Sequence, residues 1–159
     1  MAEEFSHIHK DGSVAMVDVG QKQESLRIAV AGAVVEMNAT TLDLLKRAAL
    51  PKGDVLTTAK VAGIMAAKRT SELIPMCHPV ALDYVDIRFE IRDDPPRVRL
   101  EAEARCTGRT GVEMEAIIAA QVAAAAIYDM CKAVQKDIRI TDVRLLQKSG
   151  GKSGEFRAP

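Results

Sequence analysis

The sequence predicts an α+β fold in which helices cover one face of an antiparallel sheet. Two observations lead to this prediction. Segments with strand and helix character follow the order strand, helices, strand, strand, helix, strand, and the two middle strands form a clear hairpin. This βαββαβ order is typical of a ferredoxin-like fold. The length of 159 residues fits a single domain of ordinary size.

The first half of the chain predicts one strand and two helices. Residues 26–37 (LRIAVAGAVVEM) are rich in β-branched side chains and predict a strand. Residues 39–50 predict a short helix that Thr40 or Thr41 caps and that Pro51 ends. Residues 55–74 carry apolar side chains at a spacing near 3.6, which predicts a second helix that ends at Pro75.

The second half predicts the hairpin, a long helix and a last strand. Residues 81–91 and 98–104 alternate between apolar and charged side chains, with a turn at 93–96 (DDPP). A long helix is expected from Gly111 to about residue 136, and a strand over 138–146. The glycine-rich segment from residue 148 onward is predicted to be irregular. Residues 1–12 predict a mobile tail, so residues 13–159 are expected to form one domain.

The composition argues against two classes of partner. The chain carries 22 basic and 22 acidic side chains, so no overall charge attracts it to nucleic acid or to an anionic membrane. It has no Trp, two Tyr and three Phe, which leaves few rings on which bases could stack. Its most apolar stretch, residues 116–128, is shorter than the roughly 20 residues that cross a bilayer. We therefore expect neither nucleic acid nor a membrane as a partner.

The cysteines and histidines predict a reducing compartment and no metal site. Cys77, Cys106 and Cys131 are odd in number and far apart, so they form no disulfide framework. The amino terminus lacks the basic start and apolar run of a secretory signal. We therefore expect a cytoplasmic protein. Cys77 and His78 are adjacent, and adjacent residues rarely bind one ion together.

Charged residues at the helix ends predict two clusters. If the two long helices run antiparallel, Lys52 lies near Asp129 and Lys132 at one end of the pair. His78 then lies near Glu113 and Glu115 at the other end. The helical rise separates the two clusters by about 25 Å. If both act on one small ligand, they must do so between subunits.

Each cluster also has a simpler interpretation. Asp129 and Lys132 are spaced i, i+3 and could be an ordinary surface ion pair. Apolar neighbours favour partial burial instead, which would bring their pKa values toward neutrality. Glu113 and Glu115 lie in the first helical turn, where the helix dipole alone favours carboxylates.

Several lysines and an arginine are candidates for binding phosphate. The segment GGKS near the carboxyl end lacks the earlier glycine and the following helix of a P-loop. Lys148 and Lys152 could nevertheless bind phosphates as point charges. Lys68 and Arg69 could add to such a patch, although an exposed basic helix face is the commoner explanation.

Five segments of the chain resemble the cyclic pyranopterin monophosphate synthase family. The most specific parts are CHP, TGVEMEA and YDMCK at these separations. The resemblance covers nearly the whole chain from about residue 7. The segments are MVDVG (16–20), KGDVLTTAKVAGIMAAKRTSELIPMCHP (52–79), TGRTGVEMEA (107–116), IYDMCKAVQKD (127–137) and VRLLQKSGGKSGEF (143–156).

The resemblance implies a ferredoxin-like subunit, assembled as a homohexameric trimer of dimers with active sites at the dimer interface. It implies the conversion of (8S)-3′,8-cyclo-7,8-dihydroguanosine 5′-triphosphate into cyclic pyranopterin monophosphate and pyrophosphate, a step of molybdenum cofactor biosynthesis. No step of this reaction needs a redox cofactor, so none is expected.

The resemblance also implies roles for individual residues. The catalytic residues correspond to Asp129, Lys52 and Lys132. Met76 stands where the family would have Leu. The residues expected to bind substrate are Met76, Cys77, His78, Glu113, Met114 and Glu115, with Lys68, Arg69, Lys148 and Lys152 as candidates for the triphosphate.

Two other functions are alternatives. A non-catalytic oligomeric module that senses a nucleotide or a pterin fits the composition equally well. A purely structural subunit leaves the charged helix ends unexplained. The Lys–Asp–Lys set favours the enzyme, because proton transfer requires such groups and a sensor does not.

Overall fold

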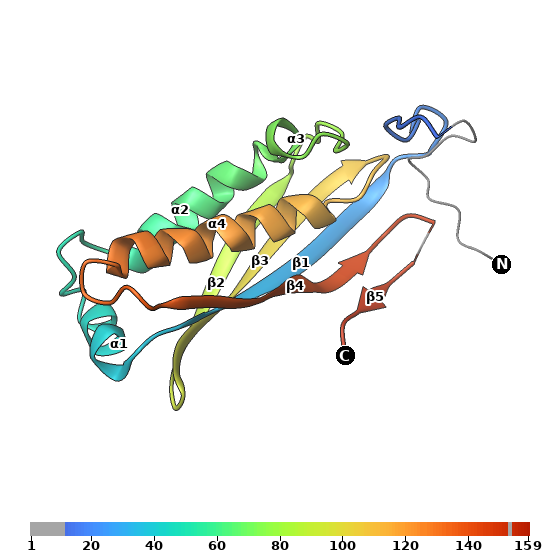
Figure 1. The fold of residues 1–159 in the computed structure, drawn as a ribbon. Coiled ribbons are helices and arrows are strands. Elements are labelled where there is room, and N and C mark those ends of the chain that lie inside the picture. Colours follow the sequence, from blue (N-terminus) through green and yellow to red (C-terminus); the bar gives the residue numbers. More distant parts are fainter. Residues whose placement is uncertain (1–11, 153) are drawn as a thin grey trace.

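A five-stranded antiparallel sheet forms the body of the computed structural model, which describes residues 12–152 and 154–159 (Figure 1). The strand order is β2-β3-β1-β4-β5, and every neighbouring pair is antiparallel. The strands are β1 (Ser25–Glu36), β2 (Tyr84–Asp93), β3 (Pro96–Gly108), β4 (Arg139–Ser149) and β5 (Phe156–Arg157).

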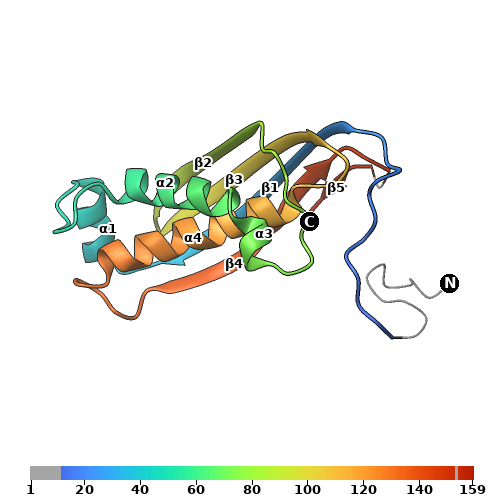
Figure 2. The same cartoon turned by 90° about the horizontal axis from the view of Figure 1, so that it is seen from above.

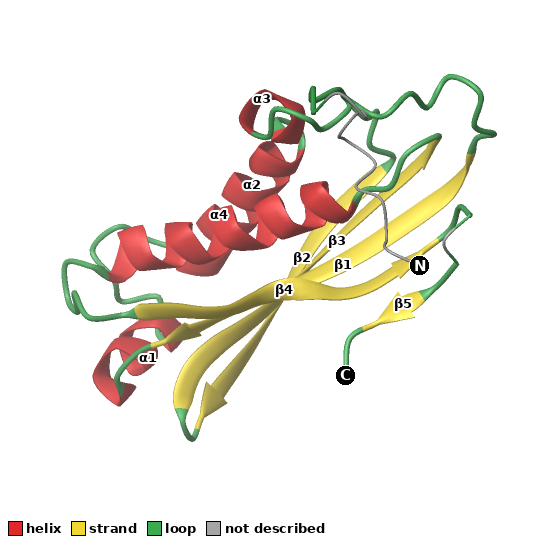
Figure 3. Cartoon of the chain, turned by 45° about the vertical axis from the view of Figure 1, so that its right-hand side comes forward, coloured by secondary structure: helices red, strands yellow, loops and turns green. Residues whose placement is uncertain are grey.

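The helices lie on one face of this sheet (Figures 1 and 3). They are α1 (Ala39–Lys46), α2 (Val55–Ala67), α3 (Thr70–Leu73) and α4 (Glu113–Cys131). α2 and α4 lie side by side over the sheet, as the view from above also shows (Figure 2). The α+β ferredoxin-like prediction is therefore confirmed. The division into a tail and one domain stays a prediction, because residues 1–11 lie outside the described residues.

Small side chains bring α4 close to the sheet. β1 pairs with β3 so that Ala29 is opposite Ala104 and Ala31 is opposite Ala102. All four of these alanines are buried. The side of α4 that faces them is also built from alanine, and the fully buried ones are Ala116, Ala119, Ala120, Ala123 and Ala124. Close packing of this kind fixes the position of α4 along its whole length.

α4 is long and apolar enough to cross a membrane by length and composition alone. The apolar stretch noted in the sequence, residues 116–128, is the middle of this helix of 19 residues. More than half of it is buried within the structure, as in a helix that forms a protein core.

The first two predicted helices differ from the structure at their ends. Asn38 caps α1, because its side chain accepts a hydrogen bond from the Thr41 N–H at 2.7 Å. Thr40 and Thr41 lie inside the helix instead. α1 ends at Lys46 rather than at residue 50, since Ala48 has a φ of 50°.

The helix predicted over residues 55–74 is divided at Lys68 and Arg69. The buried Thr70 hydroxyl donates to the Ala67 carbonyl at 3.0 Å. In a continuous helix this carbonyl would accept from the N–H of Ser71. Thr70 therefore explains why α2 ends and the short α3 begins.

The carboxyl-terminal part is more regular than predicted. α4 ends at Cys131 rather than near residue 136, and β4 continues to Ser149. The segment expected to be irregular contains β5, which pairs with Gln147 and Lys148 of β4. Gly150, Gly151 and Gly154 have positive φ values, which allow the turn between the two strands.

The contact between α2 and α4 depends on Gly63. A Cβ atom at this position would lie 2.7 Å from the Ala119 carbonyl oxygen and would overlap Ile87. We expect Gly63→Ala to lower the free energy of unfolding by about 1 to 3 kcal/mol through overpacking. Alanine is otherwise favoured over glycine in a helix by about 1 kcal/mol, so helix propensity alone would give the opposite sign.

Urea denaturation measures this difference. The control is Ala62→Ser, at the neighbouring half-exposed position, which should change the unfolding free energy by less than about 0.5 kcal/mol. Unchanged or greater stability in Gly63→Ala would contradict the close approach of the two helices.

Candidate active site

Lys52, Asp129 and Lys132 form a compact ionic cluster at one end of the helix pair. Lys52 lies in the turn before α2, Asp129 in the last turn of α4, and Lys132 directly after α4. The Lys52 Nζ donates to Asp129 Oδ2 at 2.7 Å and to the Asp129 carbonyl oxygen at 3.0 Å. The Lys132 Nζ lies 2.6 Å from Asp129 Oδ1. Each carboxylate oxygen therefore has one lysine as its partner, as the antiparallel helices predicted.

The expectation that burial brings these groups toward neutrality is wrong for the single chain. The Lys52, Asp129 and Lys132 side chains are 42%, 53% and 51% exposed. Hydrogen bonds from Lys132 and then Lys52 lower the pKa of Asp129 to about 2, and the bond to Asp129 raises the pKa of Lys132. Met130 and Cys131 are buried, but residues next to each other on a helix point to different sides.

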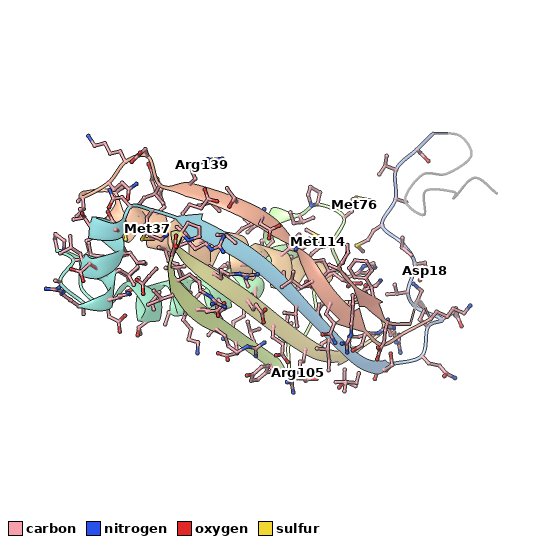
Figure 4. The ribbon with its side chains drawn as sticks, turned by 90° about the horizontal axis from the view of Figure 1, so that it is seen from below. Asp18, Met37, Met76, Arg105, Met114 and Arg139 are labelled. Atoms are coloured by element: carbon pink, nitrogen blue, oxygen red, sulfur yellow. The ribbon has the colours of Figure 1, made fainter. Side chains whose placement is uncertain are left out.

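The second predicted cluster lines a cavity of about 310 Å³ at the opposite end of α4. The loop after α3 supplies Met76, Cys77 and His78 to this cavity, and the start of α4 supplies Glu113, Met114 and Glu115. The structure thus brings together all six residues that the sequence grouped here. Figure 4 shows Met76 and Met114 toward the same end of the molecule as Asp18, with Met37 and Arg139 toward the other end.

Burial changes the acidity of two groups in this cavity. Glu115 is only 4% exposed, and its burial raises the pKa of the carboxyl, with a smaller contribution from the charge of Glu113. Burial and the nearby Glu115 also raise the pKa of the Cys77 thiol. The cavity therefore holds a buried carboxyl group whose charged form is disfavoured by its surroundings.

A segment before β1 forms another wall of the cavity. Val17 and Val19 line it, and the His78 Nε2 lies 2.8 Å from the Val17 carbonyl oxygen. Because a carbonyl oxygen only accepts, the His78 ring donates through Nε2.

Three cations that the sequence analysis missed line an adjoining cavity of about 150 Å³. Lys22, Arg27 and Arg109 lie there together with Lys148, which the sequence did single out. The Lys148 Nζ is 3.1 Å from Glu113 Oε1. Both cavities are lined by Lys22, Thr110, Gly111 and Glu113, so they lie next to each other, and we name the two together the depression.

The register of the sheet explains how these cations meet. Ser25 at the start of β1 pairs with Gly108 at the end of β3, which brings Lys22 and Arg109 to the same edge. A Cβ atom on Gly151 would collide with the Arg27 guanidinium, so a glycine there allows the chain to approach Arg27 closely. The signal in the sequence is a basic residue shortly before β1, Lys22, and another directly after β3, Arg109, because these two strands pair.

The remaining predicted phosphate-binding residues lie elsewhere. Lys68 and Arg69 are exposed at the junction of α2 and α3, and Lys152 is exposed in the turn after β4. None of the three lines either cavity of the depression. Their role stays a prediction. Among residues 12–152 and 154–159, no group of three or more His, Cys, Asp or Glu side chains could hold a metal ion.

The ionic cluster and the depression are far apart within one chain. Glu115 and Asp129 are separated by 14 positions of α4, which corresponds to about 21 Å along the helix. One chain therefore presents two separate groups of candidate site residues.

Comparisons with known proteins show the family to which the chain is related. Residues 16–151 match the model of the MoaC family. A protein of Nitratidesulfovibrio vulgaris, named cyclic pyranopterin monophosphate synthase, is 72% identical over 154 residues, which are 97% of this chain and 96% of that protein.

Two further relatives carry the same name. The protein of Desulfovibrio desulfuricans is 65% identical over 159 residues, covering 100% of this chain and 98% of its own. That of Oleidesulfovibrio alaskensis is 66% identical over 158 residues, covering 99% of each chain. Since the family model matches residues 16–151 and these three relatives are 65–72% identical over nearly the whole chain, the chain belongs to the MoaC family.

Proposed function

We propose that this chain catalyses the reaction for which its relatives are named, in molybdenum cofactor biosynthesis. It converts (8S)-3′,8-cyclo-7,8-dihydroguanosine 5′-triphosphate into cyclic pyranopterin monophosphate and pyrophosphate. The observation that carries this proposal is the two-part depression, in which a cavity with a buried carboxyl adjoins a cavity with four cations. A purine-derived ring that bears a triphosphate requires these two environments side by side.

The cavity of His78 and Glu115 holds the ring system. A guanine-type ring presents N–H donors and carbonyl acceptors on one edge, and a buried carboxyl can pair with such an edge. Met76 and Met114 supply apolar contact surface, which suits a flat ring. Glu115 thus orients the end of the substrate that becomes the pterin.

The four cations hold the triphosphate. Lys22, Arg27, Arg109 and Lys148 offset its negative charge, and the two guanidinium groups can bind phosphate oxygens in pairs. An intramolecular hydroxyl attacks the phosphorus nearest the sugar, the cyclic phosphate ester forms, and pyrophosphate leaves. Cations next to the leaving group stabilise the charge that develops on it.

The Lys52–Asp129–Lys132 cluster supplies the proton transfers. Opening the five-membered ring and closing the new ring both move protons, and positioned side chains carry them. In the single chain the carboxylate and both lysines are exposed and ion-paired, which is a resting state. Covering the cluster excludes water and weakens the preference of all three groups for their charged forms.

A second copy of the chain provides this cover. Val61 and Met65 of α2 are each about half exposed. They lie in the helical layer between the ionic cluster and the depression. A two-fold arrangement across this layer brings the ionic cluster of one subunit to the depression of the other. We therefore propose a homo-oligomer with shared sites, in which the family's trimer of dimers is the expected form, located in the cytoplasm.

A sensing module would need the depression but not the ionic cluster. Substituting the lysines therefore separates the two functions. We expect Lys52→Ala and Lys132→Ala each to lower turnover about 100-fold or more, because each removes a proton carrier. The matched control is Lys46→Ala, which removes a surface lysine paired with Asp93 and should leave turnover unchanged.

The assay uses the purified protein and the cyclised substrate, with release of pyrophosphate and the fluorescence of the oxidised pterin as readouts. Circular dichroism and light scattering check that each variant folds and assembles as the wild type does. Turnover at the wild-type level in either lysine variant would assign that lysine to the surface.

The ionisation of Asp129 tests the hydrogen bonds within the cluster. We expect its pKa of about 2 to rise toward the ordinary value of 3.8 in Lys132→Ala, and by less in Lys52→Ala. Because the folded pKa is lowered, the ion pairs stabilise the fold above pH 3.8 and lose this contribution as the pH falls through about 2.

The carboxyl carbon shift of Asp129 in an NMR titration measures this pKa. Asp86 serves as the internal control, since its pKa is lowered chiefly by Lys60 and should not respond to either substitution. An Asp129 pKa that is insensitive to both substitutions would contradict the described pairing.

Mixed oligomers test whether the site is shared. Asp129→Asn damages the ionic cluster and Glu115→Gln damages the depression, so each variant alone should be nearly inactive. In a shared site, mixing them places both lesions in one site of a mixed dimer and leaves its other site intact. Random mixing should then restore about a quarter of the wild-type turnover, because half of the dimers are mixed and each has one working site.

The exchange of subunits is monitored by mass spectrometry of isotopically labelled chains. Proven exchange without recovery of activity would mean that both clusters act within one chain. The proposal of a shared site would then be wrong.

A further inference from the structure

Residues 13–24, which we name the strap, run along one end of the molecule before entering β1 (Figure 2). Most of the strap is exposed, but Val17 and Val19 are partly buried. Both line the cavity of about 310 Å³ that contains His78 and Glu115, which we name the ring cavity. Lys22 follows them after a turn in which its N–H donates to the Val19 carbonyl oxygen at 3.0 Å. The strap therefore contributes a wall of the ring cavity. It also contributes a cation to the cavity of about 150 Å³, which we name the phosphate cavity.

Hydrogen bonds from two side chains of the main body hold the strap. The His78 Nε2 donates to the Val17 carbonyl oxygen at 2.8 Å. The Arg109 Nη1 donates to the Gly20 carbonyl oxygen at 3.3 Å, and the Arg109 Nε lies 3.7 Å from Glu24 Oε1. Arg109 fixes the end of the strap that leads into β1, whereas His78 fixes its middle, where it crosses the ring cavity.

The contact of His78 limits what this residue does while the strap is in place. Its Nε2 proton is already donated to Val17, so this atom is not available to the substrate. The partner of His78 is the main-chain carbonyl of Val17, which no substitution of the Val17 side chain removes. The contact is therefore tested by substituting His78.

We infer that His78 is a positioning residue that latches the middle of the strap over the bound ring, while Arg109 holds the end that carries Lys22. The inference rests on the proposed function for the identity of the ligand, but the latch itself is a property of the free protein. When the latch opens, the ring cavity loses the wall formed by Val17 and Val19, which lets substrate enter and product leave. When it closes, Val17 and Val19 complete the wall of the ring cavity.

Cys77 offers a direct readout of the strap. It lines the ring cavity and is partly exposed, whereas the other two cysteines of the chain, Cys106 and Cys131, are buried. Labelling of the native protein with N-ethylmaleimide therefore reports on this cavity. Hydrogen–deuterium exchange of the amides of residues 13–24 reports on the strap itself.

The experiment compares the wild type with His78→Ala, His78→Gln and the surface control Lys46→Ala, all as assembled proteins without substrate. Glutamine can place an amide N–H close to the position of the histidine Nε2–H. We expect His78→Ala to speed both strap exchange and Cys77 labelling between about threefold and tenfold, which is what one net hydrogen bond contributes. His78→Gln and Lys46→Ala should behave like the wild type.

Steady-state kinetics then separate positioning from chemistry. His78→Ala should raise KM by a factor similar to that of strap opening, with a smaller change in kcat, and His78→Gln should restore both values. Unchanged exchange and labelling in His78→Ala would overturn the latch. So would a His78→Gln protein with a closed strap and the activity of His78→Ala, because His78 would then act on the reacting molecule.

These outcomes are distinct from a failure of the proposed function. Exchange and labelling require no substrate, so they test the latch even if the lysines of the ionic cluster prove dispensable. Absence of turnover in the wild type would count against the proposed reaction and would leave the strap measurements valid.

Discussion

The close contact between α4 and the sheet determines where the two groups of candidate site residues lie. Alanines on β1, β3 and α4 leave no room for the helix to shift or rotate, and Gly63 brings α2 equally close to α4. α4 therefore acts as a rigid spacer with Glu115 near one end and Asp129 near the other. A core of larger, more adaptable side chains would permit a tilt of the helix, and the charged residues at its two ends would move with it.

Much of this architecture was predictable because its signals are local. The hairpin of β2 and β3 follows from strict alternation, and the order of the elements gave the fold class. The misplaced helix ends involve side-chain hydrogen bonds that the apolar pattern does not encode, such as the Thr70 hydroxyl that interrupts the helix after Ala67. β5 was missed because it has two residues and exists only through its pairing with β4.

The candidate site likewise contains residues that could be grouped from the sequence and residues that could not. Residues at the ends of two antiparallel helices could be grouped from the sequence, since the helical rise and the chain direction fix their positions. Lys22, Arg27 and Arg109 could not be grouped, because the register between β1 and β3 brings them together. The prediction that burial brings the pKa of Asp129 toward neutrality was wrong, because its neighbours Met130 and Cys131 are buried on another side of the helix, whereas Asp129 is exposed.

The cationic cavity has a further consequence in a chain whose formal net charge is zero. At physiological ionic strength the field of an exposed charge fades over about 8 Å. A molecule of zero net charge therefore exerts little long-range electrostatic attraction on polyanions. Its cationic cavity still attracts a small anion, such as a triphosphate, that has reached the surface nearby. Extended polymers such as nucleic acids cannot insert enough of their charge into a cavity of about 150 Å³. Under the proposed function, the distribution of charge, rather than its total, would favour a small and highly charged ligand over a large polyanion.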